Sequence, residues 1–135
     1  MANTITAGSI NRTGVGFLVV DGLSKTNTAI TIGSVVCSVI ADDGWRPTLA
    51  ADVAPYGVMV SPSVAAVAAT QHDIRVLVRG NVTVNKVSGN ALRQGQGAFT
   101  SATGGSVDDS TGSGVFVGLV TTDAAALAVV AEILI

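Results

Sequence analysis

The sequence predicts a mainly β chain, folded as a small single-domain β-sandwich or barrel with one or two short helical turns. Runs rich in β-branched residues recur at short intervals, and Gly, Asn, Asp and Ser separate them. No apolar run reaches the ~20 residues that a membrane-spanning helix needs. At 135 residues the chain has the length of one domain, enough to bury a single core.

Seven segments are expected to form the main strands. Residues 74–78 illustrate the pattern, because Ile74, Val76 and Val78 share one face while Arg75 and Arg79 lie with Leu77 on the other. This alternation is typical of a half-buried strand. The seven strand segments are residues 15–20, 29–40, 56–60, 74–78, 82–87, 115–120 and 128–135, and a brief strand is expected at 98–100.

Two dipeptides predict tight turns between neighbouring strands. Gly80-Asn81 tolerates the positive φ of a hairpin turn and is expected to pair 74–78 with 82–87. Asp43-Gly44 is expected to make the same kind of turn between 35–40 and 45–49.

Two short pieces have the composition of helices. Ser61-Pro62 supplies an N-cap and a first helical position for residues 64–69, and Thr122-Asp123 can cap residues 124–127. Both pieces are rich in alanine. Each is only about two turns long, so neither helix is stable without tertiary packing.

An internal echo links the middle of the chain to its end. Residues 57–61 lead through an Ala/Val stretch into 74–78, and residues 118–121 lead through Ala124-Ala125-Ala126 into 129–135. Each copy reads as strand, alanine-rich crossing, strand. Chance similarity in a sequence of low residue diversity is the alternative, and both interpretations stay open.

The composition predicts a surface that other subunits cover. The chain is 48% hydrophobic, yet only 12% of its residues are charged, against about 25% in an average soluble domain. Its exterior must therefore consist largely of Ala, Val, Thr, Ser and Gly, which favours membership of an assembly. The formal net charge of −2 supplies no field that would attract nucleic acid or an acidic membrane.

The sequence offers no recognisable catalytic set. His72 is the only histidine and Cys37 the only cysteine, so neither a zinc site nor a disulfide is expected. We expect His72 in a loop or at the surface and Cys37 in the core. No catalytic residue, cofactor or metal ligand is predicted, and the chain is not expected to be an enzyme.

Glycine and aspartate clusters have simpler explanations than ligand binding. Gly14/Gly16 and Gly112/Gly114 complete no phosphate-binding motif. The clusters 42–44 and 108–110 lack the alternating carboxylates and terminal Glu of an EF-hand, so we expect solvated turns there.

The order of features resembles the small decoration, or cement, proteins of tailed-phage heads. The resemblance covers residues 30–135 and is one of pattern and size. It implies a β-rich homotrimer on the outer surface of the capsid of the virion, bound to several copies of the major capsid protein. The segments that carry it are residues 33–40 with the turn at 43–44, then 55–60, 76–84, and 118–120 running into the apolar C-terminus.

This resemblance gives the two ends of the chain expected roles. Residues 1–14 would be an extended N-terminal arm, and residues 15–135 the β-rich decoration domain. The arm could add a strand to a coat edge, or it could be the first edge strand of the subunit's own sheet. The expected coat contacts are Ala2, Asn3, Thr4, Ile5, Thr6 and Ile10, and the expected seam between subunits is Val129, Val130, Ile133, Leu134 and Ile135.

Charges are expected to orient the subunits. Basic residues cluster in the middle of the chain and acidic residues lie towards its end, so they could pair within one subunit or across a boundary. The expected orienting charges are Arg75, Arg79, Lys86 and Arg93.

Two alternative functions stay open. One is another virion structural module, such as a tail or head-fibre component. The other is a carbohydrate-binding β-sandwich, which the aromatic content of 4% disfavours because sugar faces commonly need a stacking ring. Trp45 and Tyr56 are the only rings with a polar handle.

Overall fold

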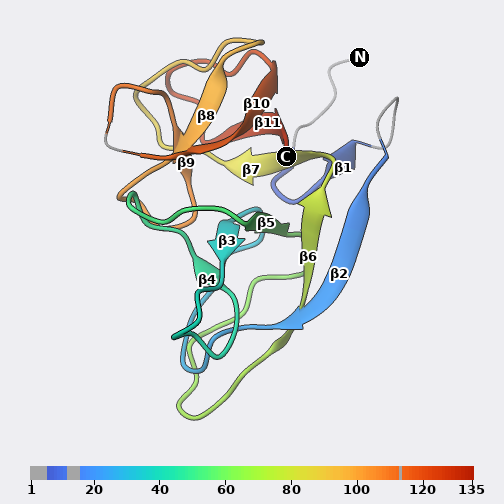
Figure 1. The fold of residues 1–135 in the computed structure, drawn as a ribbon. Helices are drawn as coiled ribbons and strands as arrows, with labels where there is room; N and C mark the ends of the chain where they lie inside the picture. Colours follow the sequence, from blue (N-terminus) through green and yellow to red (C-terminus); the bar gives the residue numbers. More distant parts are fainter. Residues whose placement is uncertain (1–5, 12–15, 113) are drawn as a thin grey trace.

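The computed structural model describes residues 6–11, 16–112 and 114–135, and within them every regular element is a strand. The strands form a six-stranded and a five-stranded antiparallel sheet, stacked as in a sandwich and not closed into a barrel (Figure 1). The strands are β1 (Ile10–Asn11), β2 (Leu18–Leu23), β3 (Val35–Cys37), β4 (Arg46–Pro47), β5 (Tyr56–Met59), β6 (Asp73–Arg79), β7 (Asn81–Asn85), β8 (Gly97–Thr100), β9 (Val107–Asp108), β10 (Phe116–Thr122) and β11 (Val130–Leu134).

The mainly β, sandwich-like prediction is confirmed, and so are most of its strands. Each of the seven expected segments overlaps an observed strand, and the brief strand expected at 98–100 is β8. The segments flanking Asp43-Gly44 do pair as antiparallel strands, because β3 pairs with β4 through Val36–Pro47 and Cys37–Arg46. The tight turn expected at Asp43-Gly44 is wrong: the connection is the loop 38–45, and its reverse turn is closed by Asp42 N–H to Val39 O. Val15 lies outside the described residues.

The two expected helices are wrong. Val64 exchanges backbone hydrogen bonds with Ile30, and Ala124 does the same with Leu92, so both backbones are held in isolated antiparallel bridges. What is left of each expected helix is a single reverse turn, closed by Thr70 N–H to Val67 O in one case and Ala128 N–H to Ala125 O in the other. A two-turn helix is too short to compete with long-range pairing.

The hairpin expected at Gly80-Asn81 is also wrong. β6 belongs to the five-stranded sheet and β7 to the six-stranded sheet, so the chain passes from one sheet to the other at Gly80. Gly80 has a φ of 135°, in a region that favours glycine, and its N–H and C=O pair with Ile135. The dipeptide does mark a sharp change of direction, but it connects layers instead of neighbouring strands.

The two sheets contain the same five-stranded motif twice. We call β2 to β6 the first repeat and β7 to β11 the second repeat. The first repeat has the strand order β2-β6-β5-β3-β4, and the second has β7-β11-β10-β8-β9. Figure 1 shows the first repeat in blue to green below and the second in yellow to red above. β1 adds the sixth strand of the larger sheet, beside β7.

Details outside the strands repeat as well. The parallel bridge Ser24–Trp45 has its counterpart in Lys86–Val107, and the antiparallel bridge Ile30–Val64 in Leu92–Ala124. Gly33 and Gly95 both have positive φ, at 84° and 89°. Gly33 N–H donates to Met59 O in β5, and Gly95 N–H donates to Val120 O in β10. The echo seen in the sequence is therefore part of a structural repeat that covers both sheets.

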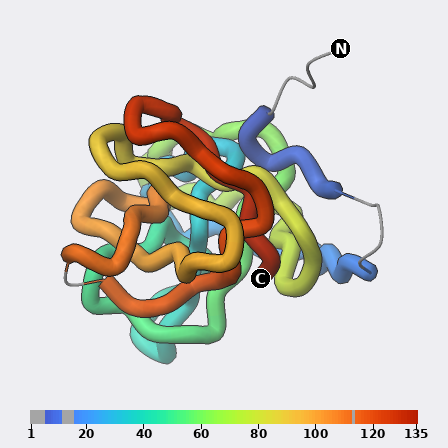
Figure 2. The backbone as a smooth tube through the Cα atoms, turned by 90° about the horizontal axis from the view of Figure 1, so that it is seen from above, coloured from blue at the N-terminus to red at the C-terminus, as the bar shows by residue number. Residues whose placement is uncertain are grey.

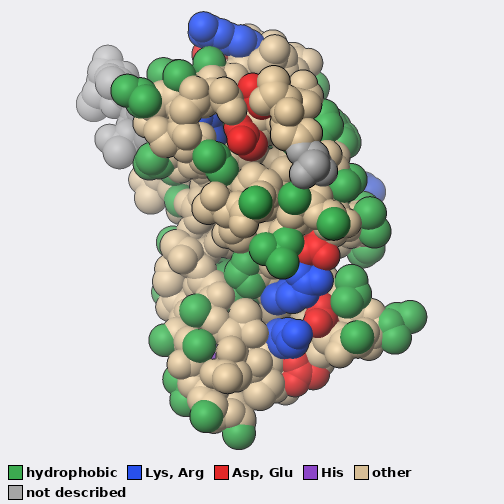
Figure 3. Space-filling view, turned by 90° about the vertical axis from the view of Figure 1, so that its left-hand side faces the viewer, with side chains coloured by type: hydrophobic (Ala, Val, Ile, Leu, Met, Phe, Trp, Pro, Cys, Tyr) green, Lys and Arg blue, Asp and Glu red, His purple; other side chains and the backbone are tan. Residues whose placement is uncertain are grey.

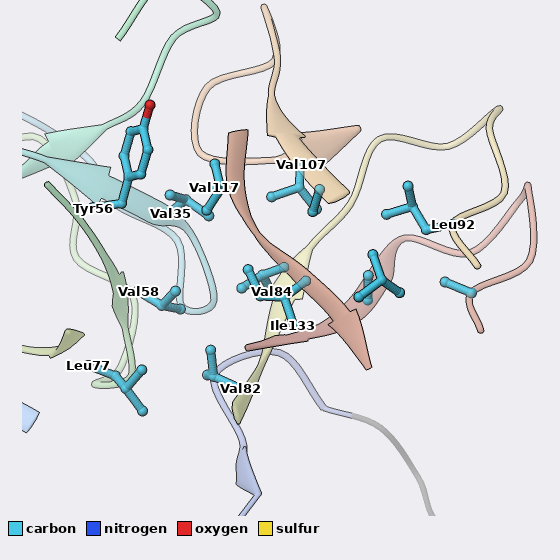
Figure 4. Packing of buried hydrophobic residues seen from close by; sticks show 14 of the residues in the cluster. Val35, Tyr56, Val58, Leu77, Val82, Val84, Leu92, Val107, Val117 and Ile133 are labelled. Atoms are coloured by element: carbon cyan, nitrogen blue, oxygen red, sulfur yellow. The ribbon is translucent and has the colours of Figure 1, made fainter. Parts of the chain in front are cut away.

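The repeats stack front to back around two apolar clusters. Ile30, Val36, Met59, Ile74 and Val76 fill the interior of the first repeat. The larger cluster joins the other face of that sheet to the interior of the second repeat, as Figure 4 shows with Tyr56, Val35, Val58 and Leu77 facing Val117, Val84, Val82 and Ile133. The second repeat thus covers one whole face of the first.

Candidate interaction surface

The register of the strands matches residues of one repeat to those of the other. Cys37 pairs with Tyr56 and Val58 with Leu77, on the face of the first repeat that the second repeat covers. We call these four residues the first outer face. All four are buried, with Tyr56 the most accessible at 7%.

The same pairs recur in the second repeat with a different outcome. Phe99 pairs with Phe116 and Leu119 with Leu134, and we call these four residues the second outer face. Phe116 is 53% exposed and Leu119 42%, while Phe99 and Leu134 are half-buried. The two phenylalanine rings meet edge to face, with centroids 5.9 Å apart, and both lie over Gly97. No further layer of the described chain covers this apolar face.

A hollow extends the second outer face at its C-terminal end. It has a volume of about 610 Å³ and is lined by Gly16, Phe17, Leu18, Arg79, Leu134 and Ile135. Phe17 and Leu18 are exposed. A second hollow, of about 390 Å³, lies at the opposite edge, where Phe99 and Gly97 meet Asp109. The apolar face is therefore bordered by Arg79 at one edge and Asp109 at the other.

The described part of the predicted arm lies on the subunit's own sheet. Ile10 pairs with Val82 and packs against the larger apolar cluster. Gly8 N–H donates to Thr83 O. Figure 2 shows this N-terminal segment in blue at one side of the molecule. For Ile10 the edge-strand alternative holds, because β1 is Ile10–Asn11. Thr6 is exposed and precedes this strand, and Ala2, Asn3, Thr4 and Ile5 lie outside the described residues.

The predicted C-terminal seam divides between interior and surface. Ile133 is fully buried in the core, so it cannot serve as a surface contact. Val129 is exposed, Val130 and Ile135 are half-buried, and Leu134 lies on the second outer face. The alternation of a strand explains the division, because successive side chains point to opposite faces.

Three of the four predicted orienting charges are at the surface. Arg75 lies 3.6 Å from Asp21 and Arg93 lies 3.7 Å from Asp123, and all four side chains are well exposed. Exposed pairs of this kind contribute little stability. Arg79 is exposed beside the C-terminal hollow.

Lys86, the fourth, is an interior residue. It is only 4% exposed, and its Nζ donates to the carbonyls of Val87, Ala126 and Ala128 at 2.8 to 3.2 Å. Burial lowers the pKa of this ammonium group. Lys86 therefore ties the loop before β11 to the end of β7, and it does not present a charge to a partner.

The charged side chains that do gather at the surface satisfy one another. Arg46 donates to both carboxylate oxygens of Asp52, at 2.6 and 2.9 Å, and to Asp42, which also pairs with Lys25 at 3.1 Å. The hydrogen bonds from Arg46 lower the pKa of Asp52 to about 2. On the face in Figure 3, the charges of the lower half form one column among hydrophobic and uncharged side chains.

The residues examined for chemistry have structural contacts. Cys37 is buried, as predicted, and burial raises the pKa of its thiol to about 11, against the opposing effect of Arg46. His72 lies in the loop before β6, as predicted, and its Nε2 is 2.9 Å from Ala65 O. Asp43 accepts hydrogen bonds from the backbone and side chain of Thr26.

Metal binding finds no support in the part of the chain that the structure describes. Those residues contain no group of three or more His, Cys, Asp or Glu side chains placed to hold a metal ion. The two rings with a polar handle are also engaged in the fold: Tyr56 is buried and donates to Asp52 O, and half-buried Trp45 packs over Gly22. The ring of Tyr56 is therefore not open to a sugar.

Phe99, Phe116 and Leu119 are candidate contact residues that the sequence did not indicate. Their pattern is that of ordinary strand residues, so nothing local distinguishes them from core. Extending the internal echo from 57–61 and 118–121 to whole strands would have paired them with Cys37, Tyr56 and Val58.

Comparison with protein-family models, with curated proteins and with solved structures finds no match to this chain. Across residues 6–11, 16–112 and 114–135 there is also no helix that could cross a membrane. The candidate function therefore rests on the surface itself.

Proposed function

We propose that this protein is a capsid decoration protein, which binds the outer face of an icosahedral viral head and stabilises the lattice of major capsid protein. The observation that carries the proposal is the surface, which combines few charges with many exposed large apolar side chains. They are Phe17, Leu18, Leu23, Val39, Ile40, Leu49, Val53, Val67, Phe116, Leu119, Leu127 and Val129. Contiguous exposed apolar side chains mark interaction surfaces in soluble proteins, and Phe116 and Leu119 adjoin Phe99 and Leu134 on one face, with Phe17 and Leu18 beside them.

The mechanism is thermodynamic. Each copy contributes many weak apolar and backbone contacts, and their repetition over symmetry-related positions raises the free energy needed to separate neighbouring coat subunits. Self-association into the proposed homotrimer multiplies the contacts that each bound oligomer makes with the capsid shell. A catalytic group has no part in this mechanism, so the absence of a recognisable catalytic set in the sequence fits it.

The direct test mixes the purified protein with undecorated capsids. Co-sedimentation with the shell and a rise in its melting temperature are expected together. A protein that stays in the supernatant at concentrations well above those of the coat subunit would refute the proposal. Binding without any rise in shell stability would refute the cementing role.

A deletion pair tests the arm within this proposal. Removing residues 2–5 leaves Ile10 and Asn11 available for β1, so the fold and its melting temperature should be unchanged while capsid affinity falls. Removing residues 2–11 also strips β1 from the edge of β7 and should lower the melting temperature. If the shorter deletion binds capsids like the intact protein, residues 2–5 make no coat contact.

A further inference from the structure

We propose that the second outer face, Phe99, Phe116, Leu119 and Leu134, is an interface between copies of this chain. The inference rests on the self-association included in the proposed function, and it names one surface through which copies meet. Two copies that meet through the same face form a two-fold pair, so a trimer needs a further contact elsewhere on the subunit. It does not require that the protein bind a coat.

The same five-stranded motif occurs twice in the chain. The first outer face and the second outer face occupy the same positions of the same five-stranded motif, with the same pairs of residues. The one difference is a register shift between Phe116 and Gly118, which adds Val117 to the second repeat. In the first repeat this face packs against the interior side of the second repeat within one chain. The motif is therefore one whose outer face is covered by another copy of itself, and only the second repeat has no such neighbour among the described residues.

The second outer face is apolar at its centre. Phe116 and Leu119 expose about half of their side chains, and the edge-to-face ring pair beside them forms a rigid apolar surface. Glu132 of β11 does not oppose burial of this face, because its carboxylate accepts hydrogen bonds from Asn81, Thr121 and Thr122. An apolar centre with satisfied polar neighbours is the usual anatomy of an interface.

Residues of opposite charge lie at two edges of the second outer face. Arg79 borders the hollow beside Leu134, and Asp109 borders the hollow beside Phe99. Copies that meet across this face with opposite edges adjoining bring Arg79 of one copy to Asp109 of the next. A second copy of the chain therefore supplies both an apolar surface and a charge opposite to each edge residue. Asp109 already accepts hydrogen bonds from Thr111, so the contact with Arg79 would add to a carboxylate that is partly satisfied in its own chain.

The test measures self-association by analytical ultracentrifugation without capsids. The intact protein should form oligomers, and Leu119→Asp should weaken the association by about tenfold or more, because it places a charge at the apolar centre. Leu119→Thr is the milder variant, because it replaces leucine with a β-branched residue that strands accept well. Ala66→Asp is the control for the added charge, since Ala66 is exposed in the first repeat and is not one of the apolar side chains assigned to the interaction surface.

Charge reversal tests the arrangement. Arg79→Asp and Asp109→Arg should each weaken association, and the double variant should recover it, because the pair is restored with its signs exchanged. A monomeric intact protein at high concentration would overturn the inference. So would an oligomer that Leu119→Asp and Leu119→Thr leave intact, provided that both variants melt like the parent.

Coat binding is measured separately on the same variants. An intact protein that forms oligomers through this face but ignores capsids would refute the decoration function and leave the interface standing. An intact protein that binds capsids as a monomer, with Leu119→Asp abolishing that binding, would assign the face to the coat and overturn the self-interface.

Discussion

The two repeats share one topology, yet they differ in what covers the same face. Tyr56 and Val58 of the first repeat are buried under the second repeat, whereas Phe116 and Leu119 occupy the matching positions in the open. Strand order and register are thus properties of the motif. Burial is a property of the stack, because it depends on whether another layer follows.

The interiors of the two repeats differ in the size of the side chains that fill them. Trp45 and Met59 fill the first interior where Val107 and Val120 stand in the second. The first interior is a cluster of its own, closed by larger side chains. The second continues into the first outer face, so its smaller side chains are supplemented by Val35, Tyr56, Val58 and Leu77. The second repeat thus shares its core with the first.

The largest expected effect is a loss of folding stability that differs between two leucines at matching positions of the repeats. Leu77 is fully buried, and Leu77→Ala should destabilise the protein by about 2 to 5 kcal/mol through lost burial and a cavity. Leu134 holds the same position in the second repeat but is half-buried. Leu134→Ala should therefore cost clearly less, about 1 kcal/mol in the dissociated subunit.

Urea denaturation of both leucine variants at low protein concentration gives the measurement. Equal losses for Leu77→Ala and Leu134→Ala would mean that the second outer face is covered within a single chain, contrary to the layering described above. A loss at Leu134 that grows with protein concentration would instead show that a second copy covers it.

This contrast also shows how far the sequence alone could lead. The strands follow from local patterns of β-branched residues, and β5, β6, β8 and β10 lie close to where those patterns predict them. Tyr56-Gly57-Val58 and Phe116-Val117-Gly118-Leu119 have similar apolar patterns. Nothing in them indicates that one face is buried and the other exposed, because that depends on the layer order.

The failed predictions have the same physical origin. Val64 and Ala124 sit in alanine-rich pieces with helix caps, but their backbone groups are taken by Ile30 and Leu92 from distant parts of the chain. Gly80-Asn81 has the residues of a hairpin turn, yet Gly80 pairs with Ile135. Local propensity identifies where the chain turns or extends, whereas the partner of each segment is fixed by tertiary packing.

The next prediction concerns glycines that both repeats require. Gly57 and Gly118 lie opposite Val36 and Ala98 in the matching register. A Cβ on Gly57 would stand 2.2 Å from Val76 Cγ1, and one on Gly118 would stand 2.5 Å from Leu134 O. Each alanine variant should lose about 1 to 3 kcal/mol of stability through overpacking. Gly112→Ala is the control, because a Cβ there meets nothing within 4 Å.

A second substitution distinguishes the two glycine sites. Adding Val76→Ala to Gly57→Ala removes the clashing methyl group, so the double variant should be more stable than the sum of the two single losses predicts. The obstacle at Gly118 is a backbone oxygen that no side-chain deletion removes. Strictly additive losses at Gly57 and Val76 in thermal or urea unfolding would contradict the contact.

The smallest expected effect is an acid dependence confined to the first repeat. The position of Arg46 in β4 is held by Asp108 in β9, so the arginine cluster with Asp52 has no counterpart there. Because Arg46 holds the pKa of Asp52 at about 2, below its ordinary value of 3.8, the ion pair stabilises the folded state above pH ~4. This contribution to the free energy of unfolding, up to about 2 kcal/mol, should disappear as the pH falls towards 2.

Urea unfolding between pH 2 and 5 should show a shallower loss of stability for Asp52→Asn and for Arg46→Gln than for the intact protein. If both variants keep the full acid slope, other carboxylates cause it, and Asp42 and Asp43 of the same repeat are the first to test because their hydrogen bonds also lower their pKa values.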